Sequence, residues 1–337
     1  MAVTFLRPTW IFDEMPLNDY FNDTGVDDTD PFTIVLPIAY GIIGSITIVA
    51  SLATIVIIIQ NLRLKENQDF LSGEHQKISN IIMISMFVAD ILFSAGYLFP
   101  RFVIHGIYNN SVYCSLVSTI APTIITIINF SLMAISIDTL DCIIHPFHLR
   151  LRTNSKALGL LMSIIIWIAS ILIGATPFIA DFRHIYPDKC IPMNIAKFEK
   201  ERLYLLCVIA ISFIAPLIIM IYCYAYIFIH IRSRQLTDRV KRKTAKVLTV
   251  FVATYFLMWS PFVICLLLNA IYEPFQLAQK FPYFRTAVVV SQLIAFSYPA
   301  VNPILYGYYV PSVRRFMLKM GNKLRFMLCF ICHQNRT

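Results

Sequence analysis

Only a few residues of this chain have types and spacing that suggest chemistry. Asp138 and Asp141 stand three places apart at the end of a long stretch without formal charge. Asp90 is a single acid within another apolar stretch, and Cys329 and Cys332 form a CxxC near the end of the chain. An aspartate such as Asp138 could belong to an active site, to a signalling switch, or to a buried helix end that meets water. The elements that hold these residues decide which of these roles is open.

The composition indicates a protein of the lipid bilayer. Of the 337 residues 58% are hydrophobic and only 14% are charged, and the mean hydropathy is +0.69. A soluble domain of this length would need more charge to cover its surface. A membrane span takes about 20 mostly apolar residues. Seven such runs occur, at residues 32–60, 78–100, 114–140, 157–179, 204–231, 245–271 and 286–309.

Each run is predicted to be an α-helix, because backbone groups in lipid must be satisfied within their own segment. The predicted fold is therefore all-α, a seven-transmembrane helix bundle. Nineteen of the 28 lysines and arginines fall on one face of it and nine on the other. The positive-inside rule then places the N-terminus outside and the C-terminus in the cytoplasm of a multi-pass plasma membrane protein. The basic inner face accounts for the net charge of +9 without nucleic acid as a partner.

Three parts of the chain follow from this orientation: an extracellular tail at 1–31, a transmembrane domain at 32–310, and a cytoplasmic part at 311–337. The tail carries seven acids and one arginine and has no apolar core, so the first span is expected to insert as its own anchor. Asn22 begins an exposed glycosylation sequon.

The cytoplasmic part is predicted to begin with an amphipathic helix. Apolar and basic residues alternate over 311–328 at helical spacing, which is typical of a helix lying on the inner membrane leaflet and contacting its lipids. Cys329 and Cys332 follow directly. Neither partner cysteines nor a cluster of histidines accompany them, so palmitoylation is favoured over a redox or metal pair.

Sequence motifs occur at a common register in almost every span. They are Val88-Ala89-Asp90, Cys114, Asp138 with His145-Pro146-Phe147, Trp167 with Pro177, Pro216 with Tyr224, Trp259-Ser260-Pro261, and Asn302-Pro303-Ile304-Leu305-Tyr306. Together they resemble the class A, rhodopsin-like G-protein-coupled receptors over residues 44–326. The resemblance implies a receptor with an extracellular ligand, a heterotrimeric G protein and in some cases arrestin as partners, with no catalytic chemistry and no cofactor.

The resemblance also implies a disulfide bond. Cys114, at the outer end of span three, and Cys190, in the second outer loop, are the two cysteines expected to face an oxidising compartment. The resemblance implies that these two are joined.

An activation switch is the next implication. Its residues would be Asp90, Asp138, Thr139, Tyr224, Trp259, Pro261, Asn302, Pro303 and Tyr306. In the family an arginine follows the aspartate at the end of span three, pairs with it at rest and meets the G protein when active, whereas this chain has Thr139. Lys241 stands where some relatives place an acid, so Asp138 is expected to pair with Lys241 or with a basic residue of the second inner loop.

Several switch residues leave alternatives open. Trp259 either packs beside the bend at Pro261 or acts as a lever that reports pocket occupancy. The Asn302-Pro303 pair is expected to break span seven, which would either give kinked packing or let Tyr306 swing towards Tyr224.

Asp90 and Asn302 are expected to face the bundle interior, because an acid at membrane depth is costly. They would form either a functional polar core or a carboxyl group satisfied by neighbouring hydroxyls. In the family this pair helps to hold sodium, so the resemblance implies at most a vestigial sodium site in this chain. At the positions where the family has residues that supply the other oxygens, this chain has Ile128, Tyr298 and Pro299.

The ligand pocket implied by the resemblance is mostly apolar. Its residues would be Ala121, Pro122, Ile125, Val208, Ile209, Ser212, Trp259, Phe262, Val263, Leu266, Gln292 and Phe296. Amine receptors have an aspartate where this chain has Ala121, and opsins have a lysine in span seven that 286–309 lacks. A peptide or a lipophilic small molecule is therefore favoured over a biogenic amine. Any one of these side chains could instead only pack helices together.

Three functions compete. The first is a receptor that activates G proteins. The second is the same fold acting as a decoy or arrestin-biased receptor, which Thr139 favours. The third is a transporter, channel or membrane enzyme, which would need several charges at membrane depth where this sequence has Asp90 alone.

Overall fold

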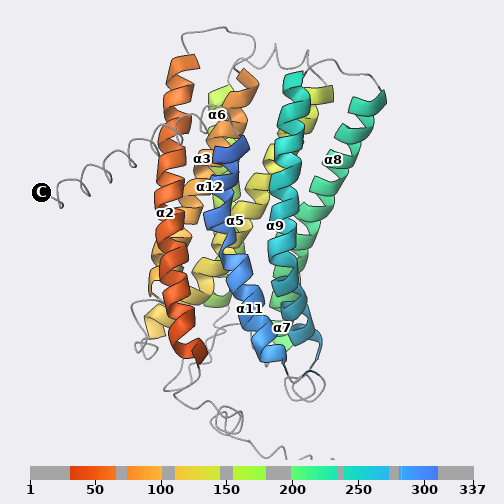
Figure 1. Cartoon of the computed structure of the whole chain (residues 1–337). Helices are drawn as coiled ribbons and strands as arrows, with labels where there is room; N and C mark the ends of the chain where they lie inside the picture. Colours follow the sequence, from red (N-terminus) through yellow and green to blue (C-terminus); the bar gives the residue numbers. More distant parts are fainter. Residues whose placement is uncertain are drawn as a thin grey trace, which may run out of the picture.

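The computed structural model describes residues 31–65, 74–100, 111–144, 155–179, 199–233, 239–272, 281 and 283–309. Regular structure in these residues is entirely helical. The elements are α2 (Pro31–Lys65), α3 (Glu74–Phe93), η1 (Ser94–Leu98), α5 (Ser111–Ile144), α6 (Ser155–Ile179), α7 (Glu199–Ile209), η3 (Ala210–Ile214), α8 (Ala215–Ser233), α9 (Arg239–Ile271), α11 (Phe284–Phe296) and α12 (Tyr298–Tyr309). Figure 1 shows them standing side by side as one bundle.

Seven helical segments of the described chain are long and apolar enough to cross a membrane. They are Val35–Gln60, Ile78–Leu98, Thr119–Ile144, Ser155–Thr176, Arg202–His230, Thr249–Ile271 and Thr286–Tyr306. The predicted all-α, seven-span fold is confirmed. The predicted boundaries agree to within a few residues except at span three. Helix α5 runs on to Ile144, so Asp138 lies inside a helix, not at its end.

The helices differ in how much of their surface the bundle covers. Of the membrane-spanning window of α5, 61% is buried, against 28% for that of α6. Helix α5 contacts α3, α6 and α8, which places it at the centre of the bundle. Helix α6 turns leucine and isoleucine side chains such as Leu161, Ile165 and Leu172 outward, as a helix facing lipid tails does.

Two spans contain a π-helical turn. η1 lies near one end of the second span, and η3 interrupts the fifth span between α7 and α8. Pro216 follows η3 closely and has no N–H to continue the ordinary hydrogen-bond ladder. A π-turn inserts one extra residue, so the helix surface before η3 is rotated relative to the surface after it.

Span seven breaks at Ser297, where α11 ends and α12 begins. The expectation of a break at Asn302-Pro303 was wrong, because α12 runs through both residues. The hydroxyl of Ser297 donates to the Ile294 carbonyl at 2.7 Å, and the chain resumes with Ala300 N–H donating to the Ser297 carbonyl at 3.0 Å. Pro299 supplies no N–H at this point, which makes the helix easiest to interrupt there.

Small residues and hydroxyl groups hold the helices close together. A Cβ built at Gly174 of α6 would clash with the side chain and the backbone nitrogen of Thr123 of α5, so only a glycine lets these two backbones approach as they do. Trp167 of α6 donates its indole N–H to Ser85 Oγ of α3 at 2.7 Å. Tyr204 donates its hydroxyl to the Ile173 carbonyl at 2.9 Å, which ties α7 to α6.

Candidate ligand pocket and activation switch

An aromatic cluster lies inside the bundle around Phe296 of α11. Figure 1 shows α11 and α7 near the same end of the bundle. Phe296 is the hub of this cluster, with ring centroids 5.2 Å from Phe93, 5.3 Å from Tyr97, 5.8 Å from Phe262 and 6.1 Å from Trp259. Phe296 is 2% exposed. Spans two, six and seven therefore meet through this one ring.

The predicted pocket residues fall into two groups in the structure. Buried within the core are Ile209, Ser212, Trp259, Phe262, Val263, Gln292 and Phe296. Partly exposed are Ala121, Pro122, Ile125, Val208 and Leu266. Three of the buried residues, Trp259, Phe262 and Phe296, contact one another, and a role of the twelve residues in ligand binding stays a prediction.

Two members of the cluster, Phe93 and Tyr97, were missed by the sequence reasoning. They stack on one another at 5.1 Å with an interplanar angle of 10° and meet Phe296 edge-on. Their spacing of four residues would place them on one helical face. Tyr97 lies within η1, however, and no sequence signal indicates that π-turn.

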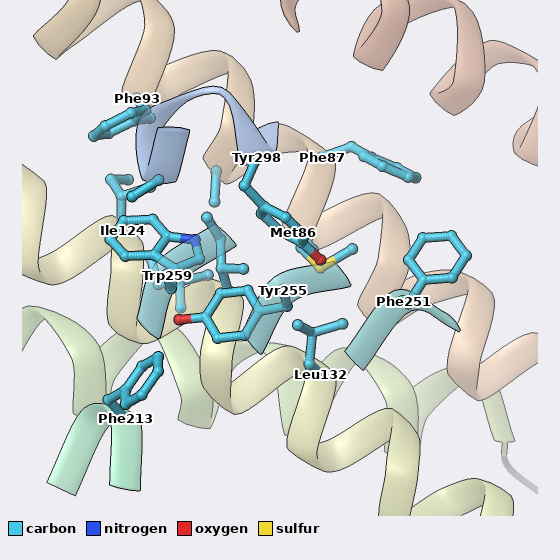
Figure 2. Packing of buried hydrophobic residues seen from close by; sticks show 14 of the residues in the cluster. Met86, Phe87, Phe93, Ile124, Leu132, Phe213, Phe251, Tyr255, Trp259 and Tyr298 are labelled. Atoms are coloured by element: carbon cyan, nitrogen blue, oxygen red, sulfur yellow. The ribbon is translucent and has the colours of Figure 1, made fainter. Parts of the chain in front are cut away.

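Trp259 continues the cluster towards the other end of the bundle. It stacks on Tyr255 at 5.9 Å and 24°, and Tyr255 in turn meets Tyr298 edge-on at 5.0 Å and 86°. Phe213 of η3 lies 5.9 Å from Tyr255. Figure 2 shows Trp259, Tyr255 and Phe213 following one another along the interior, with Tyr298 to one side. A displacement of Trp259 would therefore press directly on Tyr255.

Polar contacts join α5 to the π-turn η3. Thr126 donates its hydroxyl to Ser212 Oγ at 2.9 Å, and Asn129 Nδ2 donates to the Ser212 carbonyl at 2.5 Å. In an ordinary helix that carbonyl would accept from the N–H of residue 216, which is proline and has none. The importance of Asn129 was missed, although the sequence shows both an asparagine inside an apolar run and a proline four places after Ser212.

Asp90 and Asn302 lie together in the interior, as predicted for a polar core. Asn302 Nδ2 donates to Asp90 Oδ2 at 3.3 Å and contacts Met86 Sδ at 3.7 Å, and neither Asp90 nor Asn302 is exposed. Asp90 Oδ1 and Asn302 Oδ1 make no hydrogen bond within the described part of the chain.

A sodium ion fits these residues poorly. Asp90 and Asn302 offer two side-chain oxygens without partners in the described residues. Ile128 and Pro299, at positions where the family supplies further oxygens, have no side-chain oxygen. Tyr298 brings a bulky buried ring whose hydroxyl also lacks a partner in the described residues. The set of side-chain oxygens that the family supplies around sodium is therefore incomplete in this chain. Among the described residues no group of three or more His, Cys, Asp or Glu side chains could hold a metal ion.

Towards the opposite end of the bundle, three side-chain hydrogen bonds link different spans. Ser79 donates to Asp138 Oδ2 at 2.8 Å, Ser136 Oγ and the Tyr224 hydroxyl lie 3.1 Å apart, and the Tyr306 hydroxyl donates to Asn80 Oδ1 at 3.4 Å. The first bond joins spans three and two, the second spans three and five, and the third spans seven and two. Their partners Ser79, Ser136 and Asn80 belong to no sequence motif and were missed.

Thr139 turns its hydroxyl back into its own helix. It donates to the Ile135 carbonyl at 2.7 Å and is 2% exposed, while Asp138 is 5% exposed. Thr139 therefore packs inside the bundle and does not reach towards a partner. The predicted pairing of Asp138 with Lys241 stays a prediction, because the Lys241 side chain lies outside the described residues.

Several other predicted sites also lie outside the described residues. They are the side chain of Cys114, Cys190, the sequon at Asn22, the amphipathic helix at 311–328, and Cys329 with Cys332. The disulfide, the glycosylation and the palmitoylation remain predictions.

Comparison with known proteins places this geometry in a family. Residues 70–306 match the model of the "7 transmembrane receptor (rhodopsin family)". Human C-C chemokine receptor type 1 is 24% identical over 302 residues, covering 86% of this chain and 80% of that receptor. Human CX3C chemokine receptor 1 is 25% identical over 304 residues, covering 88% and 81%.

Rhodopsins are also similar. The GQ-coupled rhodopsin of Mizuhopecten yessoensis is 25% identical over 266 residues, covering 70% of this chain and 51% of that protein. The crystal structure of squid rhodopsin superimposes with a TM-score of 0.66 at 20% identity, covering 95% of this chain and 90% of that one, which shows the same fold. The chain belongs to the rhodopsin family of seven-transmembrane receptors, a family of multi-pass membrane receptors and not of enzymes.

Proposed function

We propose that this receptor binds an extracellular ligand between the outer halves of its helices and activates heterotrimeric G proteins from its cytoplasmic face. One observation carries the proposal. Buried contacts run without a gap from Phe296 through Trp259 and Tyr255 to Tyr298, and Tyr298 lies within electrostatic reach of Asp90. Such a chain of packed side chains can carry a change at the aromatic cluster one helical turn deeper into the bundle, towards Asp90.

The proposed orientation places the α7 and α11 end outside and the Asp138 end in the cytoplasm. The excess of lysine and arginine on the Asp138 side supports it. In this orientation the aromatic cluster lies below the outer mouth of the bundle. The hydrogen bonds of Asp138, Tyr224 and Tyr306 then lie where a G protein or arrestin would dock.

The proposed ligand is a peptide or a lipophilic small molecule. The partly exposed residues of the predicted pocket, Ala121, Pro122, Ile125, Val208 and Leu266, are all apolar. Apolar walls give little affinity to a small cation such as an amine. Similarity to two chemokine receptors agrees with a peptide-like ligand.

A second function is favoured by one specific observation. The Thr139 hydroxyl is bound to the Ile135 carbonyl, and a threonine cannot span the distance that the family's arginine covers. The receptor would then bind its ligand without activating a G protein, as a decoy or through arrestin. The hydrogen bond of Ser136 with Tyr224 favours the first function, because it joins spans three and five at this end of the bundle without an arginine.

Guanine nucleotide exchange in cells that display the receptor tests the two functions. Wild type and Thr139→Arg are challenged with fractionated extract of the source tissue at matched surface expression. We expect wild type to respond. Thr139→Lys is the matched control, because it restores the charge without the planar guanidinium. A response in Thr139→Arg alone would contradict coupling by the natural chain and support the second function.

A further inference from the structure

The buried pair of Asp90 and Asn302 joins spans two and seven by a direct hydrogen bond. Asn302 Nδ2 donates to Asp90 Oδ2 at 3.3 Å, and neither side chain is exposed. In the family the same pair helps to hold a sodium ion. Two oxygens of the pair, Asp90 Oδ1 and Asn302 Oδ1, have no hydrogen-bond partner in the described residues. Whether these two oxygens suffice for sodium depends on what surrounds them.

The side chains around the pair supply few further oxygens. At two positions where the family has oxygen-bearing residues, this chain has Ile128, which is 1% exposed, and Pro299, which is also buried. A small cation leaves its hydration shell at a large cost in free energy when it enters a protein interior. Hard cations recover that cost from a nearly complete shell of oxygen ligands. The charge of Asp90 would still attract sodium, but two of the expected ligands are missing.

Tyr298 also takes up space next to the pair. It precedes Asn302 by four residues in α12, so both side chains lie on the same face of that helix. Tyr298 is 0% exposed, and its ring meets Tyr255 edge-on at 5.0 Å. Figure 2 shows its hydroxyl pointing towards Met86, and Met86 Sδ lies 3.7 Å from Asn302 Nδ2. The phenol brings one oxygen, but its ring fills room that an ion with retained water would need.

We propose that no sodium ion binds beside Asp90 in this receptor, because the Tyr298 ring occupies the space and Ile128 and Pro299 provide no side-chain oxygens. The hydrogen bond between Asp90 and Asn302 then holds spans two and seven together by itself. The stability of the bundle is accordingly independent of sodium at this site. The inference applies to both functions considered above, since it concerns the interior of the bundle and neither ligand nor G protein.

Thermal unfolding of the full chain in lipid nanodiscs tests the proposal. The unfolding temperature, Tm, is measured in sodium chloride and in choline chloride of equal concentration, because choline is too large to take the place of sodium. An ion that binds only the folded state would raise the Tm in sodium chloride by about 2–5 °C. We expect equal Tm values. A higher Tm in sodium chloride that Asp90→Asn abolishes would overturn the proposal, whereas a difference that Asp90→Asn leaves unchanged arises elsewhere on the protein and agrees with it.

A variant that restores the oxygens and the space sharpens the test. Ile128→Ser, Tyr298→Asn and Pro299→Ser are combined, and we expect the Tm of this triple variant to rise by about 2–5 °C when sodium replaces choline. The matched control keeps the ring, so Ile128→Ser, Tyr298→Phe and Pro299→Ser together should show no such rise. Equal rises in both would overturn the role of the Tyr298 ring. No rise in either would overturn the assignment of the exclusion to these three residues.

The comparison of wild type in the two salts stands even if the triple variants fail to fold. In that case Tyr298→Asn alone is compared with Tyr298→Phe. Only Tyr298→Asn should gain a dependence on sodium, and equal behaviour of the two would overturn the role of the ring. Failure of these measurements bears on sodium alone, whereas failure of nucleotide exchange bears on the proposed function.

Discussion

The two halves of this bundle are held together by different forces. Around Phe296 the spans meet through aromatic rings, whose packing is strong in sum but permits small shifts. Around Asp138 the hydrogen bonds between spans are single ones, which join Ser79, Ser136 and Asn80 to Asp138, Tyr224 and Tyr306. Each such bond between membrane helices stabilises by only about 0.6 kcal/mol on average. Under the proposed function, the aromatic half would take up the ligand, and the polar half would open at low cost.

The largest expected effect is in the aromatic half. Phe296→Ala removes the ring that joins spans two, six and seven, and we expect it to lower the free energy of unfolding by about 3–5 kcal/mol. Phe228→Ala is the control, because Phe228 is 65% exposed on the outer surface of α8. Thermal unfolding in nanodiscs compares the two. Equal effects would mean that the aromatic cluster does not hold this half together.

A smaller effect is expected where α5 and α6 approach most closely. Gly174→Ala places a Cβ against backbone and side-chain atoms of Thr123, which should cost about 1–3 kcal/mol of unfolding free energy. Gly96→Ala is the control, since the nearest atom to its Cβ would be 3.6 Å away, on Ile120. If Gly174→Ala is as stable as Gly96→Ala, the close approach of these helices does not limit the packing.

The smallest expected effect sharpens the comparison in the polar half. Ser136→Ala and Tyr224→Phe each remove one partner of a 3.1 Å hydrogen bond. We expect a coupling of about 0.5–1.5 kcal/mol between them in a double-mutant cycle on unfolding free energy. The same variants should raise basal nucleotide exchange, because the bond holds spans three and five together at rest. Additive effects of the two substitutions would show that the pair contributes nothing to closure.

Hydropathy alone predicted the seven spans, because length and apolar content are properties of each segment by itself. The pairing of Asp90 with Asn302 was also predictable, because polar side chains at membrane depth face the bundle interior and pair with one another. The partners of Tyr224 and Tyr306 were not. These partners depend on how each helix is rotated about its axis. A single serine such as Ser136 in the sequence does not indicate that rotation.

The break in span seven shows a different limit. Asn302-Pro303 is the more conspicuous pair, yet the helix continues through it and is interrupted at Ser297, before Pro299. Pro299 and Pro303 each remove one backbone N–H donor from the helix. The packing around each proline decides at which of them the helix is interrupted. The role of Asn129 escaped prediction for a related reason, because it depends on a carbonyl of another span that Pro216 leaves without its usual donor.

The π-turn η3 has a consequence for aligning related chains. Each residue of an α-helix turns the surface by about 100°, so the one extra residue in Ala210–Ile214 puts the two ends of span five out of phase by that angle. Against a relative without this turn, an alignment anchored at Pro216 without a gap would assign Val208 and Ile209 to the wrong side of the helix. If the turn were gained or lost during evolution, the outer part of the span would rotate. Different side chains would then face a ligand, although no residue of the span had been substituted.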